Sequence, residues 1–322
     1  MQVQQQFLTY FVANNYISID QSAYRQCHST QTSLHHVIDD WLDNVSDDLY
    51  TGVGSLDIKK CFDTIDHEIL LKKLYYYGIV DIELAWFRSY LTNRTQIVKC
   101  NGKVSEKSIL NIGVPQGSVL GPLLFMIFVN DLSQNVHIGS ANLYADDTLI
   151  YCAGNTIKEA NFNLQICIDE VFKWYTGNKL VLNAGKSSSM LIASRYKTKN
   201  CVDKINIDLN GIKLDQLKTV DYLGMKIDEC MSWNDHINKL CKAISFKVSK
   251  LARLRQILPY NTVLQIYNSV IQPTIDYAIT IWGNSTPILL RSRDFRIMLL
   301  VLWFKTLTTS IIGVLILCMH WE

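Results

Sequence analysis

The alternation of hydrophobic and polar positions changes period along the chain, and each change predicts a different element. Residues 32–45 place apolar side chains at i, i+3, i+4 and i+7, which predicts an amphipathic helix. Further helices are expected over 67–77, 81–92, 118–132 and 157–176, and from Trp233 onward. Strands are expected up to Asp57, over 95–100 and 104–110, on both sides of Asp146, and near 188–193, 205–209 and 218–227. This order predicts an α+β fold, with an antiparallel sheet backed by helices and followed by a helical unit.

Local signals mark where several of these elements begin and end. The dipeptides Asn101-Gly102 and Asn210-Gly211 each predict a tight hairpin turn between two short strands. Ser118 is expected to cap the N-terminus of the 118–132 helix. Asp66 is expected to cap the 67–77 helix, which makes the neighbouring His67 structural rather than catalytic.

Composition excludes several classes of protein. The chain has 322 residues, a hydrophobic fraction of 48% and a net charge of +2, which indicates a largely globular protein and neither requires nor excludes nucleic acid. Its nine cysteines include no Cys-x-x-Cys pair, which argues against a zinc site and a secreted disulfide framework. Reduced thiols and the lack of a signal-peptide pattern predict a nuclear or cytoplasmic location.

The C-terminal tail differs from the rest of the chain. Residues 297–319 are apolar apart from Lys305 and a few hydroxyl groups, and they are long enough to cross a bilayer. The lysine near the middle would cost about 2.5–3.5 kcal/mol on insertion. Membrane association through 297–319 is therefore a minor alternative, beside an apolar extension unrelated to the preceding fold.

Three acidic residues carry the candidate chemistry. Asp57 follows one apolar strand, and Asp146 and Asp147 lie where two other apolar segments must turn. A tight turn projects neighbouring carboxylates from the strand ends, although an Asp-Asp pair alone is also ordinary turn chemistry. Carboxylates, with a backbone carbonyl lent by Ile58, are hard oxygen ligands suited to Mg²⁺. Two Mg²⁺ ions held by Asp57, Asp146 and Asp147 would favour nucleotidyl transfer.

At these positions the chain resembles the reverse transcriptases of non-LTR (LINE-type) retrotransposons, in the jockey-like branch. The resemblance runs from about residue 7 to Gly283 in family order, and only the motifs together make it specific. The matching segments are 21–25 and 28–30, the Asp57 segment, 113–122 (Gly-Val-Pro-Gln-Gly-Ser-Val-Leu-Gly-Pro), 144–147 (Tyr-Ala-Asp-Asp), 178–183 with Lys186, and 222–224.

The resemblance implies a fold and a reaction. It implies a right-hand polymerase palm with partial fingers and the start of a helical thumb. The reaction would be RNA-directed DNA synthesis, using an RNA template, a DNA primer, dNTPs and two Mg²⁺ ions, with Mn²⁺ as an alternative ion; no protein partner is indicated. The expected domains are partial fingers at 1–50, the palm at 51–230, the thumb start at 231–286 and the apolar tail at 287–322.

The resemblance also implies roles for single residues. Phe62 resembles the steric gate that rejects a ribose 2′-hydroxyl, and Gln116 and Gly117 resemble the loop that packs on the nucleotide and templating base. Arg25 resembles a fingers residue that meets the triphosphate. Lys186 resembles a general acid for the pyrophosphate leaving group.

The resemblance further implies contacts with the primer and the duplex. Residues Tyr222, Leu223 and Gly224 resemble the hairpin that grips the primer. In the helical region 237–258 the basic face that includes Lys247 and Lys250 suits contact with phosphates, although a solvated helix face would look the same.

Departures from the family pattern leave two other functions open. Ala23 and Cys27 stand where glycine is usual, which predicts strain near Arg25 if a positive φ is needed there, and Cys61 stands where alanine is usual. The missing early fingers motifs and the foreign tail suggest a truncated copy, so an inactive remnant that at most binds nucleic acid is the alternative function. An RNA-dependent RNA polymerase is disfavoured because Phe62 is bulky where a ribonucleotide needs room.

Overall fold

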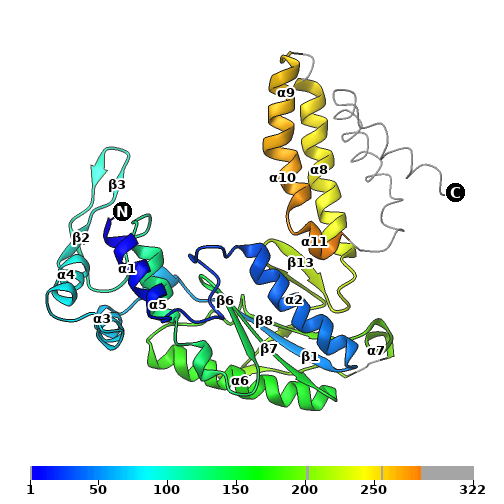
Figure 1. Ribbon diagram of the computed structural model, residues 1–322, viewed down its shortest axis with the longest axis horizontal. Coiled ribbons are helices and arrows are strands. Elements are labelled where there is room, and N and C mark those ends of the chain that lie inside the picture. The colour runs from blue at the N-terminus through cyan, green and yellow to red at the C-terminus, as the bar shows by residue number, and fades with distance from the viewer. Residues whose placement is uncertain (1, 201–202, 255–256, 284–322) are drawn as a thin grey trace. The chain divides into compact units, whose positions relative to one another are not determined.

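The computed structural model describes residues 2–200, 203–254 and 257–283 (Figure 1). These described residues fall into two compact units, one that ends at Leu223 and one that begins at Gly224. The boundary after Leu223 falls inside the residues 51–230 that were expected to form the palm.

A five-stranded sheet forms the centre of the first unit, in the order β11-β8-β1-β7-β6 (Figure 1). Its strands are β1 (Tyr50–Leu56), β6 (Ser140–Tyr144), β7 (Asp147–Gly154), β8 (Ser188–Ile192) and β11 (Asp215–Gln216). Strand β1 is central and pairs antiparallel with both β7 and β8. Only β11, which the sequence pattern did not predict, runs parallel to its neighbour β8. The sheet is therefore antiparallel, as expected, except at this edge.

Two helices cover the two faces of this sheet, α2 (Thr30–Ser46) and α6 (Ile157–Gly177). On the α2 face, Trp41 packs edge-on against Tyr151, with ring centroids 6.0 Å apart. On the α6 face, β1 presents Gly54, where an added Cβ atom would lie 2.8 Å from the Ile168 side chain. Because both faces are buried, the sheet holds its register firmly.

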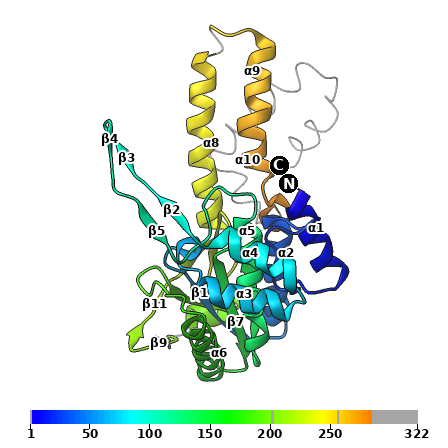
Figure 2. The ribbon, with the colours of Figure 1, turned by 90° about the vertical axis from the view of Figure 1, so that its left-hand side faces the viewer.

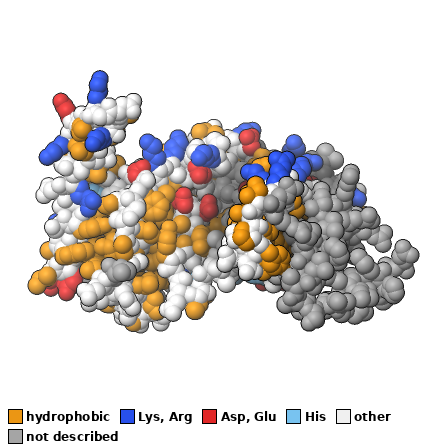
Figure 3. Space-filling view, turned by 90° about the horizontal axis from the view of Figure 1, so that it is seen from above, with side chains coloured by type: hydrophobic (Ala, Val, Ile, Leu, Met, Phe, Trp, Pro, Cys, Tyr) orange, Lys and Arg blue, Asp and Glu red, His pale blue; other side chains and the backbone are white. Residues whose placement is uncertain are grey.

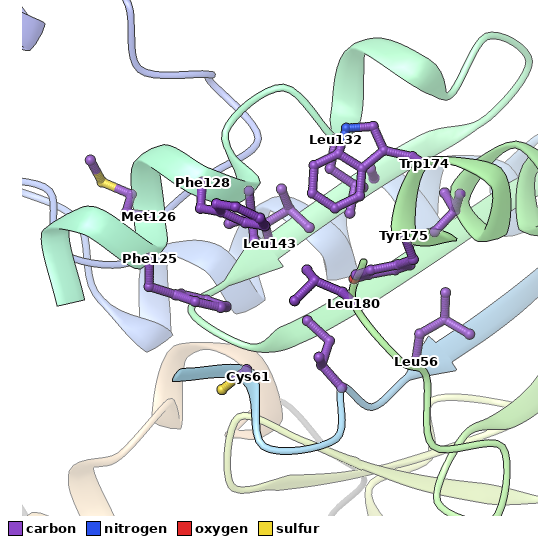
Figure 4. Close-up of a cluster of buried hydrophobic side chains, with 14 of the residues drawn as sticks. Leu56, Cys61, Phe125, Met126, Phe128, Leu132, Leu143, Trp174, Tyr175 and Leu180 are labelled. Carbon is purple, nitrogen blue, oxygen red and sulfur yellow. The ribbon is translucent and has the colours of Figure 1, made fainter. Parts of the chain in front are cut away.

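Helix α5 (Gly121–Val129) runs through the core, and its residues Leu123–Val129 are all buried. Figure 4 shows its Phe125 and Phe128 grouped with Leu143 of β6 and with Trp174 and Tyr175 of α6. A helix that is hydrophobic on every side is stable only when buried in this way.

The remaining helices of the first unit either pack around α5 or lie at the edges of the unit. They are α1 (Gln2–Ala13), α3 (His67–Tyr76), α4 (Asp81–Leu91), the short α7 (Arg195–Asn200), and the 3-10 turns η1 (Cys61–Asp63) and η2 (Ser133–Asn135). Helix α1 was not predicted, because its run of Gln residues hides a short apolar side on which only Phe7 and Phe11 are buried.

Seven short strands complete the described part of the first unit. They are β2 (Arg94–Gln96), β3 (Lys99–Cys100), β4 (Lys103–Val104), β5 (Ser108–Leu110), β9 (Asp208–Leu209) and β10 (Ile212–Lys213), followed by β12 (Thr219–Tyr222) at the unit's end. Strands β2–β5 form a long ribbon that extends away from the helices of the unit (Figure 2). Its turn has φ of +49° at Asn101 and +79° at Gly102, as the predicted hairpin requires.

The second unit is helical after one strand. It contains β13 (Met225–Asp228), α8 (Asn234–Leu254), α9 (Tyr260–Ile266), the π-helical turn η3 (Tyr267–Ile271), α10 (Gln272–Asp276) and α11 (Ile279–Trp282). The predicted apolar stripe of α8 is buried at Ile237, Leu240 and Ile244. Within the described part of the chain, no helix combines the length and the apolar character needed to span a bilayer. The tail over 297–319 lies outside the described residues.

The predicted helix over 118–132 is wrong at both ends. Helix α5 begins at Gly121 because the Ser118 hydroxyl accepts a hydrogen bond from the Gly121 N–H at 3.0 Å, which closes a turn ahead of the helix. It ends at Val129. The predicted cap of α3 is confirmed, since the Asp66 carboxylate accepts from the Ile69 N–H at 3.0 Å. His67 is buried with Nε2 2.7 Å from the Gly113 carbonyl oxygen, which fits its structural role.

Candidate active site

The Asp146–Asp147 segment forms the turn between β6 and β7. Tyr144 pairs with Asp147, so Ala145 and Asp146 are the two loop residues. Ala145 adopts φ of +55°, the left-handed conformation that is uncommon for a residue with a Cβ atom and that tight hairpin turns require. The turn leaves both carboxylates exposed at the end of the sheet.

Strand register brings Asp57 to the same end of the sheet. Leu56, the last residue of β1, pairs with Thr148 of β7, and continuing this register by one residue sets Asp57 opposite Asp147. Cα atoms of facing residues in antiparallel strands are roughly 4.5–5.5 Å apart. The three aspartates are therefore neighbours in space although some ninety residues separate them in sequence.

The charges of the three carboxylates interact. Partial burial raises the pKa of Asp147, and the negative charges of Asp146 and Asp57 raise it further. The Cys61 thiol adjoins the same group, and burial together with the charge of Asp146 raises the pKa of Cys61 to about 12. A thiol with this pKa stays neutral and unreactive at pH 7, so Cys61 acts as a wall of the site.

A turn after α6 holds Asp57 from a second direction. The Asn183 side-chain amide donates to Asp57 Oδ2 at 2.9 Å, and the Asn183 N–H donates to the Asp57 carbonyl at 2.8 Å. The Asp57 N–H in turn donates to Ser187 Oγ at 3.1 Å. These bonds fix the Asp57 carboxylate, so Asn183 and Ser187 are positioning residues. Asn183 lies in the matched segment 178–183, which implied no role for it, and Ser187 was not singled out by the sequence pattern.

The donor set fits divalent cations. Three carboxylates meet at one exposed edge, and hard oxygen ligands with unbalanced negative charge are what Mg²⁺ requires. In the ranges that the structure covers, however, no three His, Cys, Asp or Glu side chains close into a metal-binding group.

The loop over 113–117 lies against η1. The Gly113 N–H donates to the Ile65 carbonyl at 2.7 Å, and the Val114 N–H donates to the Phe62 carbonyl at 2.8 Å. Gly113 adopts φ of +84°, and an added Cβ atom would approach the Asp63 backbone to 2.8 Å, so only glycine fits there. The close approach attaches this loop to the segment that follows Asp57.

Phe62 and Gln116 are both held in this arrangement. The half-buried Phe62 ring packs against Phe125 with centroids 4.8 Å apart. The Gln116 side chain donates to Asp63 Oδ1 at 2.8 Å, a contact that the sequence did not predict. Gly117 adopts φ of +74° in open space.

Arg25 lies beside the site, but its guanidinium binds backbone carbonyls of its own segment. The Ser22 N–H donates to the Leu143 carbonyl at 3.0 Å, which attaches this segment to β6. Arg25 Nη1 donates to the carbonyls of Ser18 and Gln21 at 3.0 and 3.1 Å. Of the two residues that stand where glycine is usual, Cys27 has φ of +62° and so occupies a left-handed conformation, whereas Ala23 does not have a positive φ.

Lys186 and Ile58 flank Asp57 differently. Lys186 is exposed on the turn that contains Asn183, and its N–H donates to the Asn183 carbonyl at 2.9 Å. The Ile58 side chain is buried, so only its backbone could serve a ligand.

Of the three residues predicted to grip the primer, Tyr222 is buried, and Leu223 and Gly224 form a turn. Tyr222 is buried, which raises the pKa of its phenol, and its hydroxyl donates to Asn142 Oδ1 at 2.7 Å. Its side chain therefore points into the protein and cannot touch a primer. Leu223 and Gly224 adopt φ of +46° and +82° and form the tight turn itself.

The two predicted phosphate contacts of α8 also differ. Lys247 Nζ donates to Thr274 Oγ1 at 2.6 Å and to the Val270 carbonyl at 3.2 Å, so it joins α8 to α10 instead of presenting a charge to solvent. Lys250 is exposed, with its ammonium 4.1 Å from the centre of the Phe246 ring. Of the two, only Lys250 is placed for a phosphate.

Comparison with known proteins identifies the family. The family model described as reverse transcriptase (RNA-dependent DNA polymerase) matches residues 2–227. The chain therefore belongs to the reverse transcriptase family, and the LINE-type resemblance seen in its motifs is confirmed.

Curated relatives come from mobile elements. The chain is 29% identical over 273 residues to the RNA-directed DNA polymerase from mobile element jockey of Drosophila melanogaster, covering 82% of this chain and 29% of that protein. It is 28% identical over 279 residues to the probable RNA-directed DNA polymerase from transposon BS of the same organism, covering 82% and 30%. The chain thus spans about three-tenths of the length of these relatives.

A solved structure supports the fold. Telomerase from Candida tropicalis, determined in complex with a fragment of telomeric RNA, aligns with a TM-score of 0.50 at 11% identity, over 88% of this chain and 46% of that one. At this identity the likeness concerns the fold alone.

Proposed function

We propose that this chain is the polymerase portion of an RNA-directed DNA polymerase that extends a DNA primer on an RNA template with dNTPs. The observation that carries the proposal is the strand register that sets Asp57 opposite Asp147, with Asp146 in the adjoining turn. Family membership supports the same reaction.

In the proposed reaction, Asp57, Asp146 and Asp147 would hold two Mg²⁺ ions, or Mn²⁺ in their place. The ions would stabilise charge on the attacking and leaving oxygens of the displacement. The primer 3′-hydroxyl attacks the α-phosphorus, a new P–O bond forms as the bond to pyrophosphate breaks, and the hydroxyl proton is lost to solvent. Asn183 keeps the Asp57 carboxylate oriented through its 2.9 Å hydrogen bond.

The surrounding residues choose and orient the nucleotide. Phe62, fixed against Phe125, would fill the space of a ribose 2′-hydroxyl. Gln116 and Gly117 would pack on the incoming nucleotide and the templating base, with Gln116 steadied by Asp63. Lys186 would donate a proton to the departing pyrophosphate, and Arg25 would have to leave its carbonyl partners to meet the triphosphate.

The primer and the duplex would lie along the second unit. The Leu223–Gly224 turn would contact the primer, with Tyr222 acting only by anchoring the turn through Asn142. Lys250 would contact a backbone phosphate. We expect the protein in the nucleus or cytoplasm, where its template and primer are found.

A primer-extension assay tests the proposal. Purified chain, poly-rA annealed to oligo-dT, dTTP and Mg²⁺ should give extended primer, and Asp146→Asn should reduce the rate by at least about a hundredfold. Asp169→Asn, which removes a carboxylate from the exposed side of α6, is the matched control and should keep the rate. Equal activity of the Asp146 variant and the wild type would refute the proposal.

Sugar selection provides a second test. Phe62→Val should admit rNTPs, because it vacates the space that the ring occupies beside Phe125. If this variant gains no rNTP incorporation while it still uses dNTPs, the assignment of Phe62 as the gate is wrong.

A further inference from the structure

A basic ribbon leaves the first unit beside the candidate site. We call residues 94–110, which contain β2 to β5, the arm. Every residue from 95 to 109 is exposed, and Figures 1 and 2 show the arm extending away from the helices at its root. A ribbon so exposed adds little to the core, so its sequence is free to serve binding.

The charge of the arm is concentrated and positive. It carries Arg94, Lys99, Lys103 and Lys107 against one carboxylate, Glu106, a net charge of +3 where the whole chain has +2. Figure 3 shows Lys and Arg side chains gathered on this projecting part of the surface. Such a local excess attracts a polyanion, and it disfavours a protein partner that lacks strong negative charge.

Two stacked aromatic rings, Trp86 and Tyr90, lie on α4 just before the arm begins, and we call this pair the ladder. Trp86 and Tyr90 are four residues apart and so lie on one face of α4, and Arg94 begins β2 just beyond the end of the helix. The Trp86 and Tyr90 rings are stacked with centroids 5.7 Å apart and an interplanar angle of 9°, and the Arg94 guanidinium lies 5.5 Å from the centre of the Tyr90 ring. Trp86 remains 42% exposed, so part of this stack is open to a further flat group.

A cleft of about 800 Å³ extends from Arg94, where the arm begins, to the loop over 113–117. Arg94 and Gln96 line one part of it, and Lys60, Asp63 and Gln116 line another. A strand in this cleft would meet two cations, Arg94 and Lys60, and would end at the 113–117 loop, which is proposed to pack on the templating base.

We propose that the arm, the Trp86–Tyr90 ladder and this cleft bind one unpaired nucleic-acid strand, the single-stranded template RNA ahead of the site. The lysines neutralise phosphates while the ladder stacks on a base, the combination that single-strand binding requires. Bases paired in a duplex have no free face for the ladder, which favours a single strand. The identity of the strand as template rests on the proposed function, whereas the binding does not.

Equilibrium binding of the full chain to a fluorescent single-stranded RNA tests the role of the arm. Replacing Lys99, Lys103 and Lys107 together by alanine should weaken binding by about tenfold to a hundredfold at 0.1 M salt. It should also reduce the slope of log affinity against log salt concentration by about 2, since each phosphate contact on a single strand contributes about 0.7. The matched control replaces the exposed lysines Lys158, Lys173 and Lys213 and should change the slope far less. Equal losses in the two triple variants would overturn the proposal.

Substitutions in the ladder test the choice of a single strand. Trp86→Ala should weaken single-stranded RNA binding on the order of tenfold, Trp86→Phe should restore most of it, and Phe162→Ala, which removes an aromatic ring that is 65% exposed on α6, should have no effect. If an RNA–DNA hybrid duplex loses as much affinity as the single strand does, the arm binds duplex and the single-strand assignment fails.

The same measurements separate this inference from the proposed function. Asp146→Asn should bind single-stranded RNA like the wild type although it does not extend a primer. If the wild type extends no primer yet the arm variants lose RNA binding, the proposed function fails and the arm inference stands. If the wild type extends primers and the arm variants bind RNA normally, the arm inference fails alone.

Discussion

The central sheet and the arm are both antiparallel β-structure, but they lie in opposite surroundings. Strands β1 and β7 have α2 on one face and α6 on the other, and their residues are mostly buried. The arm has no such cover and is exposed from residue 95 to 109. The sheet ends in carboxylates, whereas the arm carries lysines.

This difference shows what each kind of chemistry requires of the fold. Three like charges at one edge repel one another, so only a rigid frame can hold Asp57, Asp146 and Asp147 together. Attraction between lysines and a phosphate chain acts over several ångströms and tolerates motion. A buried sheet suits the first task and an exposed ribbon suits the second.

The largest contrast should appear in stability. Leu149→Ala in β7, at a fully buried position, should lower the free energy of unfolding by about 3 kcal/mol because it leaves a cavity between the sheet and α2, on the face that Tyr151 shares with Trp41. Val104→Ala in the arm, at a position that is 56% exposed, should change it by less than about 0.5 kcal/mol. Urea denaturation of the two variants makes the comparison, and similar losses would mean that the arm belongs to the core.

Two glycines with the same backbone conformation provide the next contrast. Gly113→Ala should destabilise the protein by about 2 kcal/mol, because φ is +84° and the new Cβ atom would overlap the Asp63 backbone. Gly102→Ala in the arm has φ of +79° and open space, so its cost should be about 1 kcal/mol or less. Thermal unfolding measures both, and a larger cost at Gly102 would contradict the packing of the 113–117 loop.

Separating ion dependence from RNA affinity tests the division of labour. Asn183→Ala should raise the Mg²⁺ concentration for half-maximal primer extension by about tenfold, since it releases the Asp57 carboxylate. Its affinity for single-stranded RNA should be unchanged. The triple lysine variant of the arm should lose affinity for single-stranded RNA and keep the Mg²⁺ requirement of the wild type. If either variant changes both the Mg²⁺ requirement and the RNA affinity, the two regions do not have separate roles.

The smallest effect concerns the charge of Asp147. Its pKa is raised in the folded protein, so the folded state binds the proton more tightly and stability falls as the pH rises from the unfolded value near 3.8 through the raised one. Without divalent ions, Asp147→Asn should therefore stabilise the protein at pH 7. The gain should be less than about 1 kcal/mol because the side chain is exposed and screened, and it should vanish below pH 3.8. Unfolding curves at pH 7 and pH 3.5 measure it, and a variant less stable than the wild type at pH 7 would contradict the repulsion.

Much of the fold was predictable from hydrophobic period and turn chemistry. The structure has α2, α3, α4 and α6 within two residues of the predicted ends, and hairpins at Asn101-Gly102 and Asn210-Gly211. Helix α1 and strand β11 were not predicted, because a two-residue apolar side and a two-residue strand leave no periodic signal. The start of α5 was mistaken because Ser118 closes a turn ahead of the helix instead of capping it.

The candidate site likewise contains residues that the sequence predicted and contacts that it did not. The ends of apolar segments and the family motifs indicated Asp57, Asp146 and Asp147, and the sheet brings them together. The burial of Tyr222, the use of Lys247 to join α8 and α10, and the Asn183 and Asp63 contacts depend on residues distant in sequence. No local pattern encodes such partners.

The sequence by itself determined which residues bear charge, where the chain turns and which family it belongs to, because these depend on neighbours along the chain. Tertiary structure decided which side chains remain available, since burial and hydrogen bonding engage some candidates and leave others exposed. It also showed that the arm is an exposed surface, because its lysines form one positively charged patch only when the ribbon extends away from the helices.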